Sequence, residues 1–595
     1  MSNASLSRHA LIDQIVRVLS CGAGLISLLT LISIFIFLLV FSLPLLTSGH
    51  WSEIMSWTWR PYQGHYGILP MIVGSLALST AAFMLAYPTA LGICIFVCAP
   101  WANPWLRQCK RLVLAVITFM TAIPTIVYGF VSLFLLIPLL STTVGGNGPS
   151  ILAASLTLSL LILPTIVLFL HAALSETEQQ TRLTSASLGC TPLHAVLLVV
   201  LPGSASGLRM AALMGFCRAI SDSLIPLTLA GNAPQLPASV FDSVRTLTAH
   251  IALVVATDNS SPAFHSLFAC GLLLFGTTLI VQLGLYSRKT KNTSLGPRSL
   301  GILATMAAHP VWRSLVLGWS IFSVSIILGA IGALMSFLLY RSLPVINLHL
   351  FFGDAPVLAA IFGRAPVWDG IFAACVGTMT LVVLASCMAI PLGISAGIAL
   401  SHYIPSPIRQ ALSFSANALA GVPSIVMGLF GFSLIIFLRH TIAPEANTCL
   451  LLAALCIALL VLPYTINATV VALASMPEEL RLLGPSLGMT TWQSLRHILL
   501  PAASRGILKG AVLSMGRAAE DTAVILLTGV VASGGLPKGL LDKFEALPFA
   551  IYYLATQYQS EADLHKGFAA ALTLLTLTVL LYGCARALRT GMEKT

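Results

Sequence analysis

The chain has 595 residues, of which 57% are hydrophobic and only 8% carry a charge, with a net charge of +11. A soluble domain needs roughly 25% charged residues to cover its surface, so the composition excludes a chain surrounded by water. Attraction to anionic lipid is enough to explain the positive charge, and we expect no nucleic-acid partner. No phosphate-binding GxxxxGK[ST] loop and no Cys or His spacing typical of a metal site occurs, so we expect neither an enzyme nor a metal-binding protein.

Apolar segments long enough to cross a bilayer core of about 30 Å recur along the whole chain. They are apolar on every face, as in ISLLTLISIFIFLLVF at 26–41, and they lack the period-two alternation of a barrel strand. The sequence therefore predicts an all-α polytopic membrane protein of about twelve transmembrane helices, near 24–46, 69–98, 112–139, 151–171, 207–231, 264–286, 314–340, 370–400, 411–438, 449–475, 507–532 and 567–586.

The positions of the basic residues predict how these segments are oriented. Arg8 and Arg17 precede the first apolar segment, which by the positive-inside rule places the N-terminus in the cytoplasm. Alternation from there places 172–206, 476–506 and the C-terminus on the same side.

The sequence repeats itself at an offset of 299 residues. Arg218 and Asp222 of RAISDS return as Arg517 and Asp521 of RAAEDT. Other stretches return in the same order: IPTIVYGF (123–130) as VPSIVMGL (422–429), and SLGCTPLHAVLLVVLPGSASG (187–207) as SLGMTTWQSLRHILLPAASRG (486–506). We predict two six-helix repeats, 1–286 and 314–595, joined by a cytoplasmic linker at 287–313 and related by an axis along the membrane normal.

The repeated Arg and Asp lie in segments that are otherwise apolar. A charge at mid-bilayer costs at least about 2.5–3.5 kcal/mol, so both arginines should face the bundle interior or a water-filled path. Positions i and i+4 share one helix face, which favours pairing within each helix. One interpretation is two structural pairs. The other is a substrate path in which Arg218 and Arg517 bind an oxyanion while Asp222 and Asp521 orient them.

Glu520 adds an acid to the second repeat alone. It either lowers the affinity for a dianion or forms a hydrogen bond as a protonated acid, and the sequence leaves both open.

A polar segment between the fourth and fifth spans of each repeat ends in Leu-Pro, thirteen residues after a Leu-Gly. This spacing resembles the coupling loop of ABC-importer permeases, which implies docking into a groove of a separate ATPase. The family's acidic residue is missing, and an amphipathic loop without a partner is the alternative. The residues that would form the two coupling segments are Leu183, Gly189, Pro202, Leu482, Gly488 and Pro501.

Further motifs narrow the resemblance to the phosphate-specific ABC importers. RAISDS and RAAEDT are similar to that family's R-A-I-G-E-T, with Asp222 and Asp521 in place of its Glu. SVRTLTAHIAL (243–253) resembles an external loop of the C-type permease, and EALPFAIYYLA (545–555) the corresponding loop of the A-type. From about 64 to 586 the chain thus resembles a C-type permease followed by an A-type permease, with the type I ABC-importer fold.

This resemblance implies a function and a set of partners. The chain would be a permease of the bacterial inner membrane that moves inorganic phosphate inward. Two copies of a cytoplasmic ATP-binding subunit would use ATP and Mg²⁺, and the permease itself would bind no cofactor. A periplasmic phosphate-binding protein would meet the external loops 232–263 and 533–566. The alternatives are a sulfate or molybdate permease, a transport-deficient signalling scaffold, and an ion-driven secondary transporter.

Overall fold

The computed structural model describes residues 3–47, 54–99, 103–146, 148–187, 189, 191–255, 261–288, 310–365 and 367–592, most of which are helical. The chain divides into two compact units. Unit 1 contains Met1–Trp51, Ile251–Gln282 and Val345–Thr595, and unit 2 contains Ser52–His250 and Leu283–Pro344.

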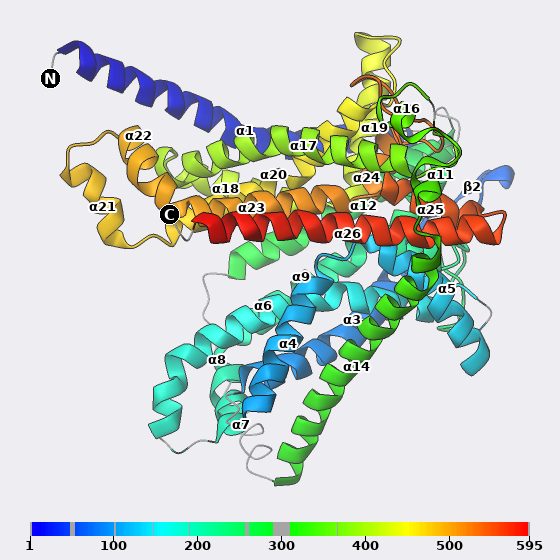
Figure 1. Ribbon diagram of the computed structural model, residues 1–595, viewed down its shortest axis with the longest axis horizontal. Helices are drawn as coiled ribbons and strands as arrows, with labels where there is room; N and C mark the ends of the chain where they lie inside the picture. Colours follow the sequence, from blue (N-terminus) through cyan, green and yellow to red (C-terminus); the bar gives the residue numbers. More distant parts are fainter. Residues whose placement is uncertain are drawn as a thin grey trace. The chain divides into compact units, whose positions relative to one another are not determined.

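Unit 2 is built around three long helices that lie side by side. α3 packs along α6, and α6 packs along α9 (Figure 1). A Cβ on Gly207 or Gly215 of α9 would collide with Ala173 or Ile166 of α6. In lipid the hydrophobic effect does not drive helices together. The van der Waals contacts that small residues permit at close approach pack them instead. The elements are the hairpin β1 (Trp59–Arg60) and β2 (His65–Tyr66), α3 (Leu69–Cys98), α4 (Pro104–Met120), α5 (Thr125–Thr143), α6 (Ile151–Ser187), α9 (Ala205–Ser221), α10 (Leu224–Leu229) and α14 (Pro310–Ser342).

Unit 1 repeats this plan with α17, α20 and α23 as its three long helices (Figure 1). A Cβ on Gly393 of α17 would lie 2.6 Å from the Cβ of Thr465 on α20, so the same small-residue contacts hold these helices. The elements are α1 (Asn3–Thr47), α12 (Pro262–Arg288), α15 (Leu348–Phe352), α16 (Val357–Ile361), α17 (Phe372–Ile398), α18 (Ser406–Gly421), α19 (Ser424–Thr441), α20 (Leu450–Ala474), α23 (Leu500–Glu520), α24 (Ala523–Thr528), α25 (Leu547–Gln557) and α26 (Glu561–Met592).

The first helix of each sequence half packs on the helices of the other half. α1 contacts α17, α18 and α19, and the ring centroids of Phe37 and Phe430 lie 5.5 Å apart in an edge-to-face contact. α14 in turn packs on α3 and α5. The packing units therefore differ from the predicted halves by this exchange and by α12, most of which belongs to unit 1 although it lies in the first half of the sequence. Most of the predicted linker 287–313 lies outside the described residues, so the domain boundaries stay a prediction.

The predicted fold class is confirmed. Among the described residues, eleven helices are long and apolar enough to cross a membrane, or up to twelve if one bent pair counts as a span. The predicted segment 69–98 has the bounds of α3.

Four predicted segments are wrong as continuous helices. The segments 112–139 and 411–438 each break before a proline, Pro124 or Pro423, after which α5 or α19 begins. Proline disfavours the α conformation of the residue before it, which ends the first helix there. The other two, 207–231 and 507–532, break at Asp222 and Asp521.

The fifth spans of the two repeats also differ from each other. In the first repeat the chain bends by 74° between Leu193–Gly203 and Ala205–Ser221, whereas Thr491–Glu520 forms one span. At the bend Ser204 has φ −97° and ψ 18°, and its Oγ donates to Thr177 Oγ1 at 2.8 Å. The second repeat has Ala502 and Ala503 in place of Gly203 and Ser204. Alanine is the strongest helix former, while glycine and serine favour the break.

We expect Gly431→Ala to destabilise the protein by about 1–3 kcal/mol through overpacking. The new Cβ would lie 2.6 Å from Cys456 Sγ and 2.7 Å from Thr528 Cγ2. Gly332→Ala is the matched control, because no atom lies within 4 Å of its added Cβ. The measurement is the thermal-unfolding midpoint of the purified protein in detergent, and equal midpoints for the two variants would contradict the packing argument.

Candidate functional site

The fifth span of each repeat is interrupted at its aspartate. α9 ends at Ser221 and α10 begins at Leu224, with Asp222 extended between them at φ −71° and ψ 138°. In the second repeat α23 ends at Glu520, Asp521 is extended at φ −79° and ψ 116°, and α24 begins at Ala523. The break is thus a property of the repeat.

Each aspartate starts the short helix that follows the break. Asp222 Oδ2 accepts the backbone N–H of Ile225 at 3.0 Å, and Asp521 Oδ1 accepts that of Val524 at 3.0 Å. Each carboxylate, from the residue just before the N-cap Ser223 or Thr522, thus satisfies an unpaired N–H of the first turn as a capping side chain does. The positive end of the helix dipole also favours a carboxylate at this position. Asp is a preferred capping residue, so the shorter acid has a clear structural role here.

Arg517 lies in a buried cluster with both acids of its repeat. Its Nη1 is 3.8 Å from Glu520 Oε2, and its Nη2 is 3.9 Å from Asp521 Oδ2. The side chains are 17%, 8% and 2% exposed for Arg517, Glu520 and Asp521. Nη2 also donates to Ser424 Oγ, 3.4 Å away, at the start of α19. The predicted approach of Arg517 to Asp521 is found, but the two do not share one helix, because Asp521 lies beyond the end of α23.

The first repeat places its residues in a similar way with one acid fewer. Arg218 lies in the last turn of α9, half-buried, and Asp222 is buried. The Asp222 carbonyl accepts a hydrogen bond from Thr248 Oγ1 at 3.0 Å. Ser221 occupies the position of Glu520, and its Oγ donates to the Arg218 carbonyl at 3.3 Å.

A glycine in each of the repeated motifs IPTIVYGF and VPSIVMGL allows close contact with the short helix that follows the break. A Cβ on Gly129 would lie 3.0 Å from Thr228 Oγ1 of α10, and one on Gly428 would lie 3.0 Å from the Ala523 carbonyl of α24. The proline of each motif precedes α5 or α19, and its glycine lets that helix approach the chain beyond the break.

The predicted coupling segments present apolar side chains to solvent. Leu183, near the end of α6, is 84% exposed, and Leu482, on α21 (Glu478–Ser486), is 59% exposed. Gly189 and Gly488 both have φ 71°, a conformation that glycine adopts without strain. Exposed leucines beside a tight turn fit a surface that a partner covers.

Pro202 and Pro501 each follow a π-helical turn. α7 (Pro192–Ala195) continues into Val196–Val200, and α22 (Thr491–Ser494) continues into Leu495–Leu499. Proline has no N–H and its ring clashes with the carbonyl four residues earlier. The wider turn makes room for the ring at both positions.

Asp13 is a residue that the sequence did not single out. Its Oδ1 accepts the backbone N–H of Trp492 at 2.8 Å and the hydroxyl of Tyr403 at 3.3 Å. Trp492 lies in the first turn of α22, so α1 supplies a capping carboxylate to the second coupling segment. No local pattern signals a contact between residues 479 positions apart.

Comparison with known proteins identifies the family of this chain. The family described as "Binding-protein-dependent transport system inner membrane component" matches residues 389–594. The "Probable ABC transporter permease protein YqgH" of Bacillus subtilis is 32% identical over 225 residues, covering 37% of this chain and 72% of that protein. The chain belongs to the ABC transporter permeases.

Relatives named for phosphate transport match different parts of this permease. The "Phosphate transport system permease protein PstC" of Mesorhizobium japonicum is 26% identical, covering 47% of this chain and 90% of that protein. The "Phosphate transport system permease protein PstA" of Mycobacterium leprae is 33% identical, covering 36% and 70%. The predicted resemblance to a C-type and an A-type permease in one chain is confirmed.

We expect Asp13→Ala to expose the backbone N–H of Trp492 to solvent. A hydrogen bond to a charged group contributes about 1.5–3 kcal/mol, so amide exchange in α22 should accelerate by about tenfold or more. Asp13→Asn keeps an acceptor oxygen and should have a smaller effect. Hydrogen exchange measured by mass spectrometry is the test, with Glu479→Gln on neighbouring α21 as the control. An unchanged rate in Asp13→Ala would contradict the capping role.

Proposed function

We propose that this permease moves inorganic phosphate inward across the bacterial inner membrane as part of an ATP-driven importer. The observation that carries the proposal is the buried Arg517 cluster at a helix break that recurs as Arg218 and Asp222 in the other repeat. The relatives named PstC and PstA support phosphate as the anion.

The arginines are the residues that would bind the anion. A guanidinium presents a planar fork of donors that matches two oxygens of a tetrahedral oxyanion. Glu520 and Asp521, with carboxylate oxygens 3.8 and 3.9 Å from the Arg517 guanidinium, orient this guanidinium and offset its charge. The anion competes for these donors, so it is held reversibly.

ATP hydrolysis would be supplied by two copies of a separate cytoplasmic subunit that use ATP and Mg²⁺. The coupling segments that contain Leu183 and Leu482 would dock into them, with Gly189 and Gly488 forming the turns and Pro202 and Pro501 ending the segments. A periplasmic phosphate-binding protein would meet the opposite side, where the loops 232–263 and 533–566 contain α11 (Leu247–Val254) and α25. Both termini would then be cytoplasmic.

Uptake into vesicles tests this function. Vesicles containing the permease and its ATPase should accumulate radiolabelled phosphate only when ATP and the binding protein are both supplied. Preferential uptake of sulfate or molybdate would instead identify another oxyanion. Uptake driven by an ion gradient without ATP would identify a secondary transporter. No uptake by an assembled complex would favour the signalling scaffold.

We expect Arg517→Gln to reduce phosphate uptake at least a hundredfold while the protein still inserts and binds its ATPase. The substitution removes the charge and the fork of donors but keeps a polar side chain. Arg409→Gln, which neutralises an exposed arginine of α18, is the control and should transport normally. Normal uptake by Arg517→Gln would refute a role in the anion path.

Two substitutions at Asp521 separate its role in helix capping from the role of its charge. Asp521→Ala should lose about 1 kcal/mol of stability with the cap, whereas Asp521→Asn keeps a capping oxygen and should keep the stability. Both remove the charge that orients Arg517, so both should lower uptake at least tenfold. The measurements are thermal midpoint and phosphate uptake of each variant. Normal uptake by Asp521→Asn would confine this residue to helix capping.

A further inference from the structure

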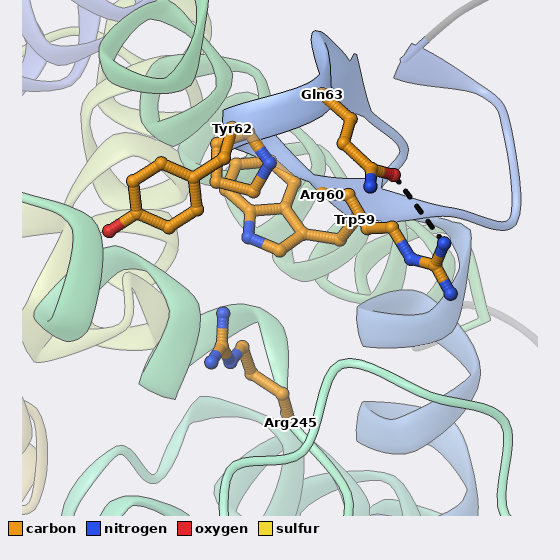
Figure 2. Close-up of a pocket in the computed structure, with 6 residues that line it drawn as sticks. Trp59, Arg60, Tyr62, Gln63 and Arg245 are labelled. Atoms are coloured by element: carbon orange, nitrogen blue, oxygen red, sulfur yellow. Dashed lines mark hydrogen bonds between the residues drawn. The ribbon is translucent and has the colours of Figure 1, made fainter.

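Unit 2 contains a pocket of about 450 Å³ beside the β1–β2 hairpin. Figure 2 shows Arg245 pointing toward Trp59 and Tyr62 of the hairpin. Arg60 and Gln63 lie beyond Trp59, on the side away from Arg245. The lining residues are Trp59, Arg60, Pro61, Tyr62, Gln63 and Arg245. Two are arginines and none is acidic, so the pocket has a net positive charge.

Arg245 is held rigidly at the base of this pocket. Its Nε donates to the Asn232 carbonyl at 2.9 Å. Its own carbonyl lies 2.6 Å from where a Cβ on Gly74 of α3 would be, so the backbone is wedged against that helix. Among the residues that the structure describes, no group accepts a hydrogen bond from its two terminal nitrogens. These donors are therefore available to a ligand.

The surroundings favour an anion over other ligands. Burial lowers the pKa of the Arg245 guanidinium, but an arginine keeps its charge in proteins. His250, buried beneath Trp59 with ring centroids 4.3 Å apart, has its pKa lowered by burial to about 3 and is neutral. Arg60 Nη1 donates to Gln63 Oε1 at 3.4 Å, which leaves the Gln63 amide nitrogen as a further donor. The side-chain groups that remain are mostly hydrogen-bond donors.

We propose that this pocket binds an oxyanion of the phosphate class at the guanidinium of Arg245. The fork of Arg245 matches two oxygens of such an anion, and the Trp59 ring reduces contact with water and strengthens the attraction. The anion is either free phosphate or the headgroup of a phospholipid. This binding site is separate from the transport path, and its existence does not depend on the proposed function.

The second repeat has an acid at the position that corresponds to Arg245. Arg245 follows Val244, which bridges to Gly231, and the residue that follows the corresponding bridge of Val530 with Phe544 is Glu545. Glu545 Oε1 accepts the backbone N–H of Gly535 at 2.7 Å, and burial raises the pKa of this carboxyl. At this position the second repeat therefore has an acid that bonds within its own loop, where the first repeat has a cation.

Equilibrium binding of radiolabelled inorganic phosphate to the purified full chain tests the proposal. In detergent without added lipid, Arg245→Gln should bind phosphate at the pocket at least tenfold more weakly than the wild type. Arg245→Lys should retain part of the affinity, and Lys543→Gln, which removes a charge from the corresponding loop of the second repeat, should bind normally. Thermal midpoints of all variants establish that they are folded.

Two further arms identify the source of the anion and separate this site from the path. If phosphatidylglycerol in phosphatidylcholine nanodiscs displaces phosphate from the wild type, the occupant is a lipid headgroup; if it does not, the occupant is the free ion. Binding that persists in Arg517→Gln but is lost in Arg245→Gln assigns the anion to this pocket. Binding that is lost only in Arg517→Gln, or unchanged in Arg245→Gln, overturns the proposal.

Discussion

The carboxylate of Asp521 performs two tasks at once, and the arrangement of the second repeat depends on it. Its Oδ1 starts α24 by accepting the N–H of Val524, while its Oδ2 faces Arg517. A guanidinium in an apolar bundle needs a nearby acid to offset its desolvation. A helix that stops inside the bundle needs an acceptor for its first N–H groups. One aspartate at the break meets both needs, so the charge and the interruption of the helix are found together.

Close packing keeps this break in place. α19 presents Gly428 and Gly431 to α24, and an added Cβ on either would press on Ala523 or Thr528. α19 also begins with Ser424, which accepts a hydrogen bond from Arg517. The eight-residue motif VPSIVMGL therefore starts α19, contacts Arg517 and packs against the short helix α24. Small residues permit this in lipid, where dispersion and hydrogen bonds hold helices together.

The sequence predicted those features that repeat or that follow from hydropathy. The fold class came from hydropathy, the internal repeat and the family resemblance, and the bounds of α3 and the approach of Arg517 to Asp521 came from local pattern. The breaks inside apolar segments were not predicted from such patterns, because hydropathy is the same whether a helix continues or is interrupted. Pro124 and Pro423 were nevertheless signals for two of these breaks. The exchange of α1 and α14 and the bond from Trp492 to Asp13 are long-range contacts that no local pattern encodes. The pocket at Arg245 was hidden for the same reason, since its lining joins segments far apart in sequence.

The two repeats share one plan but differ at the residues that set local geometry and charge. Ser204 bends one fifth span where Ala503 keeps the other continuous, and Pro477 separates α21 from α20 where Glu178 leaves α6 unbroken. Proline ends a helix by withholding an N–H, whereas glutamate is a good helix former. Because these differences fall in the coupling segments and fifth spans, the two repeats present different surfaces to any pair of identical partners. A single chain fixes which repeat carries which surface, so such a partner pair would be engaged asymmetrically.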